Sequence, residues 1–195
     1  MDIIMMRHGE SVDNVLKVFP RDDCDLTELG RKQVRDNSKY LSEMNIDEVL
    51  VSPYIRTLQT YEEVSKYLDA PHKIYNDIHE VNSGLIKGLT FEESQDAFPE
   101  IMNNWMEDIF NVRLPNGESY SDALERVEGV IEYLKENYRD STVLLVTHGG
   151  FIRLMLAYVL EDISIYGKFD ITNASLSAVT LGEHNKILYV NHINR

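Results

Sequence analysis

Two short apolar runs in this chain each end in a histidine followed by glycine. Residues 3–6 lead into Arg7 and His8, and residues 143–146 lead through Thr147 into His148. Runs of this length with glycine just beyond them predict buried strands whose carboxyl ends open into loops. Ligands of open α/β sheets bind at that edge. If the two strands are neighbours, we expect both histidines to face one pocket.

The rest of the pattern alternates between strand-like and helix-like segments, which indicates an α/β fold. Apolar residues recur at helical spacing in residues 27–44, 52–68, 119–138 and 149–160. Residues 49–51 and the region of Ile74 predict further strands, and residues 175–193 alternate like two strands joined around residues 182–185. We expect a single-domain three-layer sandwich with a mostly parallel central sheet flanked by helices.

The boundaries of several elements are also predicted. Thr27 is expected to cap the helix that follows it, and Ser52-Pro53 to start the next one with proline in its first turn. Residues 91–110 predict short helices broken at Pro99. No repeat or linker divides the chain, so residues 1–195 are expected to form one domain in which residues of about 85–115 lie as a lid over the site.

Composition narrows the class of partner. With a net charge of −14 and a pI near 4.8, the chain lacks the basic surface that binds nucleic acid. Residues 154–160, the longest apolar stretch, are too short to span a bilayer, and the first residues do not resemble a secretory signal. Cys24 is the only cysteine, as expected in a reducing cytoplasm. We expect a cytoplasmic enzyme with a small phosphorylated substrate, no nucleic-acid or membrane partner, and a homodimer left open.

The strand ends carry the candidate chemistry. A neutral histidine such as His8 can attack phosphorus, and Arg7 beside it can bind two phosphoryl oxygens through its forked guanidinium. His148 precedes a helix whose amino end favours anions. Arg56, in the first turn after the strand at residues 49–51, is expected to reach the same edge. Gly9 is expected to let the backbone approach the phosphoryl group closely. Because His8 follows a strand, we expect it to lie on a loop outside the core.

The ordered motifs resemble the histidine phosphatase superfamily, which has the phosphoglycerate mutase-like fold. The similar segments are Arg7-His8-Gly9-Glu10-Ser11 with Asn14, residues 23–30 with Gln33, residues 52–60, Glu80 with Gly84 and Gly88, residues 115–119, and residues 147–150 with Arg153. Together they cover nearly the whole chain.

The resemblance implies the roles of the individual residues. His8 would be the nucleophile that forms a phosphohistidine, and Arg7, Arg56, His148 and Asn14 would bind the transferring phosphoryl group. Glu80 would act as general acid and then as general base; the residues alone do not distinguish it from neighbouring acidic residues. His79 beside it is expected to point to the opposite face. The family chemistry implies no metal and no cofactor, and no His-x-x-x-His or His-Glu-x-x-His spacing suggests a zinc site.

Departures from the family pattern bear on the substrate. Residues 19–21 occupy a stretch where many members carry glycine, and we expect them to form a wall of the pocket, with Arg21 either contacting a second anionic group or lying on the surface. The predicted lid is acidic, with Arg113 its only basic residue between Gly88 and Pro115. An acidic lid would repel a second phosphate. We therefore favour a phosphatase over a phosphoglycerate mutase with the same residues; a catalytically silent module that binds phosphorylated ligands is the third alternative.

Overall fold

The computed structural model describes residues 1–193, and its strands and helices alternate as the pattern predicts. The strands are β1 (Asp2–Arg7), β2 (Glu48–Val51), β3 (His72–Ile74), β4 (Thr142–Thr147), β5 (Leu176–Thr180) and β6 (Lys186–His192). The α-helices are α1 (Val12–Leu16), α2 (Glu28–Leu41), α3 (Ile55–Val64), α4 (Phe91–Ala97), α5 (Pro99–Glu107), α6 (Tyr120–Asn137) and α7 (Gly149–Val159). Short 3-10 helices occur at η1 (Asn76–Ile78), η2 (Gly84–Ile86) and η3 (Ile163–Lys168).

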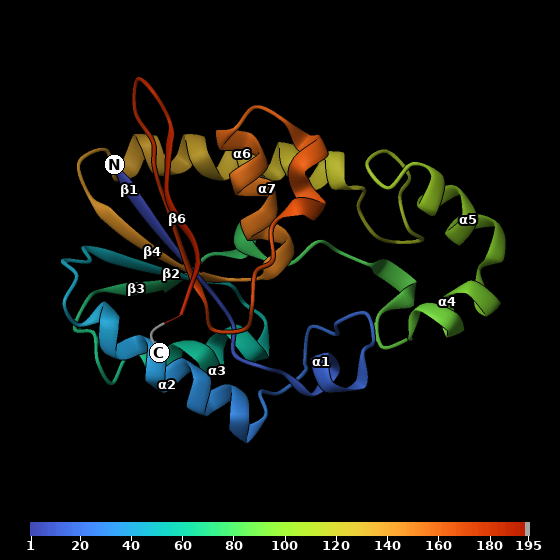
Figure 1. Ribbon diagram of the computed structural model, residues 1–195, viewed down its shortest axis with the longest axis horizontal. Coiled ribbons are helices and arrows are strands. Elements are labelled where there is room, and N and C mark those ends of the chain that lie inside the picture. Colours follow the sequence, from blue (N-terminus) through green and yellow to red (C-terminus); the bar gives the residue numbers. More distant parts are fainter. Residues whose placement is uncertain (194–195) are drawn as a thin grey trace.

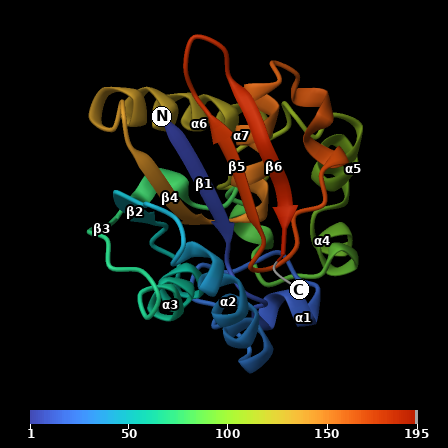
Figure 2. The same cartoon turned by 60° about the vertical axis from the view of Figure 1, so that its left-hand side comes forward.

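One six-stranded sheet, in the order β3-β2-β4-β1-β5-β6, forms the middle layer (Figure 2). The strands β1, β2, β3 and β4 are parallel, and β5 and β6 join antiparallel to their neighbours. Helices α6 and α7 cover one face and α2 and α3 cover the other (Figure 1). The three-layer, mostly parallel sandwich is thus confirmed.

Strand alternation divides the core between the two faces. Ile3 and Met5 of β1 pack with the α6–α7 layer, whereas Ile4 and Met6 pack with the α2–α3 layer. Both faces of β1 are buried because helices cover both, which is why its sequence is uniformly apolar rather than alternating.

The register of β1 and β4 brings the two histidines together. The strands pair in parallel, with Arg7 opposite Thr147, and the His8 amide donates to the Thr147 carbonyl at 3.0 Å. The two strands are neighbours, which is the condition under which both histidines were expected to face one pocket. Since β2 pairs with the other side of β4, the loops after three parallel strands open at one edge of the sheet.

The predicted start of the second long helix is wrong. Helix α3 begins at Ile55 after an N-cap at Tyr54, so Ser52 and Pro53 lie outside it. The backbone of Tyr54 is extended, with ψ of 145°, and the Ile55 amide donates to the Asp22 carbonyl at 3.1 Å. This contact with a distant loop holds the chain out of the helix for three residues. The short helices α1 and η3 were not predicted.

The segment between Gly88 and Pro115 folds as two short helices that project beyond the end of the sheet (Figure 1). Proline is the first residue of α5, so the predicted break at Pro99 is confirmed. Ile86, Met102 and Leu114 form a small buried cluster with Phe98 and Trp105 packed against it. Within residues 1–193, no helix has both the length and the hydropathy required to cross a membrane.

Candidate active site

The two histidines lie side by side at the carboxyl edge of the sheet. Their ring centroids are 5.4 Å apart. His8 Nδ1 lies 2.7 Å from the Gly9 carbonyl oxygen, so in the neutral ring Nδ1 donates and Nε2 keeps a lone pair. His8 lies on the loop after β1, as expected, but it is only 3% exposed and therefore buried.

Both rings are neutral at physiological pH. Burial lowers the pKa of His8 and of His148 well below the ordinary 6.5, and the charge of Arg56 lowers both further. A neutral imidazole is the form that can act as a nucleophile. Neither ring therefore carries the charge that an ion pair needs, and each has one nitrogen with a lone pair.

Two arginines border the histidines: Arg56 is fully buried and Arg7 is half-buried. Arg7 donates from Nη1 to the Ile171 carbonyl at 2.5 Å, and Arg56 donates from Nη1 to the Arg21 carbonyl at 2.6 Å. Arg7 Nε, Arg56 Nε and Nη2, and His148 Nδ1 are buried and have no protein partner. The Nε2 of His148 lies 2.7 Å from Ser52 Oγ, so the Ser52 hydroxyl can donate and leave Nδ1–H as a donor. Buried unpaired donors are costly unless a ligand accepts from them, and their shared preference is for an anion.

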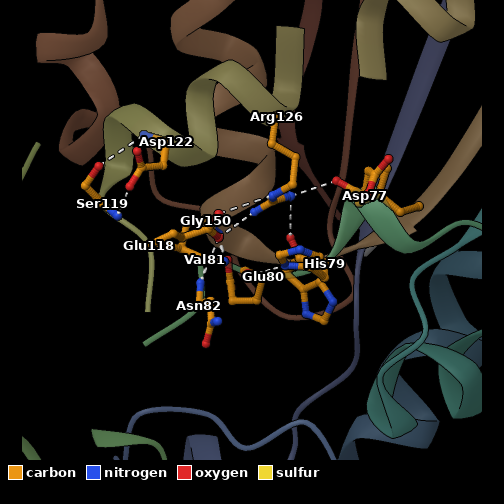
Figure 3. Close-up of polar contacts among 12 residues, drawn as sticks. Asp77, His79, Glu80, Val81, Asn82, Glu118, Ser119, Asp122, Arg126 and Gly150 are labelled. Atoms are coloured by element: carbon orange, nitrogen blue, oxygen red, sulfur yellow. Dashed lines mark hydrogen bonds and ion pairs between the residues drawn. The ribbon is translucent and has the colours of Figure 1, made fainter. Parts of the chain in front are cut away.

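Glu80 approaches this cluster from the loop after η1. Its Oε1 accepts from the Val81 amide at 3.0 Å, and its Oε2 accepts from the Gly150 amide at 3.2 Å (Figure 3). A Cβ at position 150 would lie 2.2 Å from Glu80 Oε1, so only glycine admits the carboxyl group there. The amino end of α7, which begins directly after His148, thus holds Glu80, and the charge of Glu80 acts on Arg7 and Arg56.

Arg126 fixes the loop that carries Glu80. From α6, its Nη1 donates to the Asp77 carbonyl at 2.7 Å and to the His79 carbonyl at 3.2 Å. Its Nη2 donates to Glu118 at 2.7 Å, and the same carboxyl group accepts from the Asn82 amide at 2.8 Å. In Figure 3, Arg126 lies between Glu118 on one side and Asp77 and His79 on the other. The pair therefore holds the loop on both sides of Glu80.

Comparison with known proteins identifies the family. A family model described as the histidine phosphatase superfamily (branch 1) matches residues 3–192. The chain belongs to the histidine phosphatase superfamily. It is 29% identical to phosphoserine phosphatase 1 of Hydrogenobacter thermophilus over 188 residues, which cover 95% of this chain and 89% of that protein. It is 34% identical over 161 residues to the human 6-phosphofructo-2-kinase/fructose-2,6-bisphosphatase 4, covering 82% of this chain but 33% of that protein.

Solved structures show the same fold. The alpha-ribazole phosphatase from Shigella flexneri has a TM-score of 0.91 at 23% identity, with 98% of this chain and 96% of that chain covered. The mycobacterial glucosyl-3-phosphoglycerate phosphatase has a TM-score of 0.85 at 22% identity, covering 97% and 98%. At these identities the likeness concerns the fold alone. The family model and the phosphatase relatives identify this histidine phosphatase as a phosphomonoesterase of the family type.

Asn14 keeps a hydrogen-bond donor near His8, whereas Arg21 is paired with an acidic residue. Asn14 Oδ1 accepts from the Ser11 amide at 3.1 Å and from Asn173 Nδ2 at 3.0 Å, which leaves the Asn14 amide nitrogen as a donor. Arg21 is ion-paired with the fully buried Asp13, and its side chain is 47% exposed. Substrate binding by Arg21 stays a prediction. The Arg21 backbone carbonyl accepts a hydrogen bond from Arg56 and so helps to hold that side chain in the histidine phosphatase site.

Several residues of the site were not found from the sequence. The centroid of the Tyr54 ring lies 5.2 Å from the centroid of the His148 ring. It also lies 5.1 Å from Arg56 Cζ. Asn173 donates to the His8 carbonyl at 3.2 Å. His79 stacks on Tyr54 at 6.0 Å and does not point to the opposite face as expected. The position of Tyr54 between a strand and a helix was a usable signal, whereas Asn173 had none.

Gly9 makes a close contact that the sequence did not predict. A Cβ there would lie 2.4 Å from the Gly30 carbonyl oxygen and 2.9 Å from a methyl carbon of Val34. Glycine is therefore required by the close packing of this loop against α2, whatever binds at His8. The paired glycine, Gly30, is needed for the same reason, because its Cβ would lie 2.0 Å from the Glu10 carbonyl oxygen.

A cavity of about 180 Å³ extends from Glu80 toward the lid. Its wall consists of Phe19, Pro20, Glu80, Val81, Ser83, Trp105, Leu114, Glu118, Tyr120, Gly150, Arg153 and Tyr166. Phe19 and Pro20 occupy the predicted wall, and Trp105 and Leu114 come from the predicted lid. The exposed acidic residues of the lid, such as Glu92 and Glu100, face solvent and are not part of the wall.

Proposed function

We propose that this protein is a metal-independent phosphatase that hydrolyses small phosphomonoesters through a phosphohistidine at His8. The observation that carries the proposal is the set of buried donors without a protein partner on Arg7, Arg56 and His148, beside the free Nε2 of His8. A phosphoryl group carries three oxygens that accept from such donors. Neutral nucleophile and cationic surroundings together favour attack on a phosphate ester over any reaction of a neutral substrate.

In the first step, His8 Nε2 forms a bond to phosphorus while the bond from phosphorus to the leaving oxygen breaks. Protonated Glu80 gives its proton to that oxygen, so an alcohol leaves. The charge on the transferring group is shared among Arg7, Arg56 and the Nδ1–H of His148, and the Asn14 amide adds a donor. Loss of one such donor typically raises a barrier by about 2.7–4 kcal/mol.

In the second step, the Glu80 carboxylate removes a proton from water, and the water oxygen bonds to phosphorus. The P–N bond to His8 breaks, phosphate leaves, and both residues return to their starting states. The two guanidinium groups supply the positive charge that metal ions supply in many phosphoryl-transfer enzymes, so each step uses only side chains of the chain.

We also propose that residues of about 85–115 close over the substrate as a lid. Trp105 and Leu114 already border the cavity at Glu80. The preference for a phosphatase over a mutase rests on charge, but the charges differ from those expected: Glu80 and Glu118 line the cavity, whereas the lid carboxylates face solvent, where salt screens them. A second phosphate would meet the two cavity carboxylates.

The charge and cysteine content support the remaining points of the proposal. A net charge of −14 favours a small phosphorylated substrate over nucleic acid. The single buried Cys24 suits a reducing cytoplasm.

The test is phosphate release in EDTA from p-nitrophenyl phosphate and small alkyl phosphomonoesters by the wild type, His8→Ala and the exposed-site control His184→Ala. We expect release by the wild type and the control and none by His8→Ala. An acid-labile phosphoenzyme should form on the wild type and on the control but not on His8→Ala. Release by His8→Ala at the wild-type rate, or release that EDTA abolishes, would contradict the proposal. Phosphoryl return to an added phosphoglycerate, with no phosphate released, would favour the mutase.

A further inference from the structure

Asp13 carries a buried carboxylate that the proposed reaction does not use. It lies in the first turn of α1, and its side chain is fully buried. Burial raises the pKa of Asp13, but hydrogen bonds from the side chain and the backbone of Arg21 more than offset this, so the pKa lies below its usual value and the carboxyl group is charged at neutral pH. A buried charge is costly unless its partners are well placed, so the groups that Asp13 binds indicate its role.

Asp13 holds Arg21 by both its backbone and its side chain. The Arg21 amide donates to Asp13 Oδ2 at 2.7 Å, Arg21 Nε donates to Oδ1 at 3.2 Å, and Arg21 Nη2 pairs with the same Oδ1. Residues 19–25 contain neither helix nor strand, so no regular backbone pairing holds this peptide unit. The carboxylate therefore fixes the main chain of Arg21 as well as its guanidinium.

The main chain that Asp13 fixes is attached to α3. Arg56 Nη1 donates to the Arg21 carbonyl at 2.6 Å, and the Ile55 amide donates to the next carbonyl, that of Asp22, at 3.1 Å. Within residues 1–193, the Arg21 carbonyl is the only hydrogen-bond acceptor of the Arg56 guanidinium, whose Nε and Nη2 are buried without a protein partner. The direction in which these two donors point therefore depends on where the Arg21 carbonyl lies.

We propose that Asp13 is a positioning residue: by fixing the Arg21 peptide unit, it aims the unpaired donors of Arg56 at the transferring phosphoryl group. The inference rests on the proposed function, in which Arg56 binds that group. Arg21 acts here through its carbonyl, and its guanidinium serves to bind Asp13. The aim of Arg56 matters because a displacement of about 1 Å can slow a reaction by about 10²-fold.

The experiment is a double-mutant cycle on kcat and KM for p-nitrophenyl phosphate, whose leaving group needs no proton, so that slow variants still give a measurable rate. We expect Asp13→Asn and Arg21→Ala each to lower kcat by about 10- to 100-fold while KM stays nearly unchanged. In the Arg56→Gln background, each should lower kcat by less than about twofold, because no guanidinium remains to be aimed.

Two features of the design separate positioning from a general loss of structure. Asp36→Asn is the matched control, because Asp36 pairs with two lysines on the exposed surface of α2 and should affect neither kcat nor KM. Urea unfolding shows whether Asp13→Asn is folded. If it is not, Arg21→Ala decides the cycle, since the Arg21 side chain is 47% exposed and its removal leaves no cavity in the core.

Each other outcome overturns a defined claim. Losses of equal size with and without Arg56→Gln would show that Asp13 only supports α1. A loss confined to KM would place the Arg21 guanidinium on the substrate instead. Wild-type kinetics in both variants would refute the positioning role and leave the phosphatase intact. No release by the wild type would refute the proposed function, and this inference with it.

Discussion

Glu80→Gln removes the proton that the proposed first step delivers to the leaving oxygen, while keeping the length of the side chain. General acid–base catalysis contributes about 10²- to 10⁴-fold, equivalent to about 2.7–5.4 kcal/mol at 1.36 kcal/mol per tenfold change. An alkoxide needs this proton, whereas p-nitrophenolate leaves without it. We therefore expect Glu80→Gln to slow hydrolysis of glycerol 3-phosphate by at least about 10²-fold and that of p-nitrophenyl phosphate by less than about tenfold.

The structure predicts a smaller effect common to both substrates. Both carboxyl oxygens of Glu80 accept from backbone amides, those of Val81 and Gly150. Glutamine keeps one acceptor and turns an NH₂ group toward the other amide, which shifts the side chain. This displacement acts equally on both substrates, so it cancels in the ratio of their rates.

The assay measures single-turnover release of each alcohol with excess enzyme, which isolates the first step from hydrolysis of the phosphoenzyme. Glu92→Gln, on the exposed surface of α4, is the control and should change neither rate. Equal losses on the two substrates in Glu80→Gln would remove Glu80 from the role of general acid. In that case its position at the amino end of α7 would have only a structural purpose.

Two further predictions concern the support of the site and its protonation. Arg126→Lys removes the forked guanidinium that binds the Asp77 and His79 carbonyls and Glu118. We expect this variant to hydrolyse alkyl phosphates more slowly, and we expect the difference to disappear when Glu80→Gln is also present. A loss of rate of equal size with and without Glu80→Gln would contradict this. Burial and the charge of Arg56 lower the pKa of His8 and of His148 in the folded protein below the 6.5 of the unfolded chain. Below pH 6.5 the unfolded state therefore binds more protons than the folded state. The free energy of unfolding should then fall between pH 7.5 and 5.5, by up to about 1.4 kcal/mol per pH unit for each histidine. Urea unfolding should show a weaker pH dependence in His148→Gln, and an unchanged dependence would refute the assignment.

Much of the fold could be predicted because hydrophobic spacing records which faces are buried. The uniform apolar runs of β1 and β4 indicated strands covered on both faces, and helices cover both faces in the structure. The capping chemistry was also local: Thr27 accepts from the Gly30 amide, as its place before α2 predicts. These features depend on residues within one or two turns of each other, so a single sequence contains them.

The residues of the site also differ in how far the sequence alone predicts them. His8, Arg7 and His148 follow directly from the ends of two strands, and Arg56 follows from the strand next to them. Glu80 lies on a loop without regular spacing, so only the resemblance to the family distinguished it from nearby acidic residues. Its place at the amino end of α7 depends on the Gly150 amide, 70 residues away in the chain.

What the sequence by itself determined is the set of strands and helices, and the strand ends where the reactive histidines and arginines lie. Only the tertiary structure decided which contacts the loops at these strand ends make with the rest of the chain. The packing of α2 requires glycine at position 9, Arg126 holds the Glu80 loop, and Arg153 faces the cavity at Glu80. The physical reason is that burial imposes a period on the residues of one element, whereas a contact between loops depends on the order of the strands and the path of each loop, and neither leaves a period in the sequence.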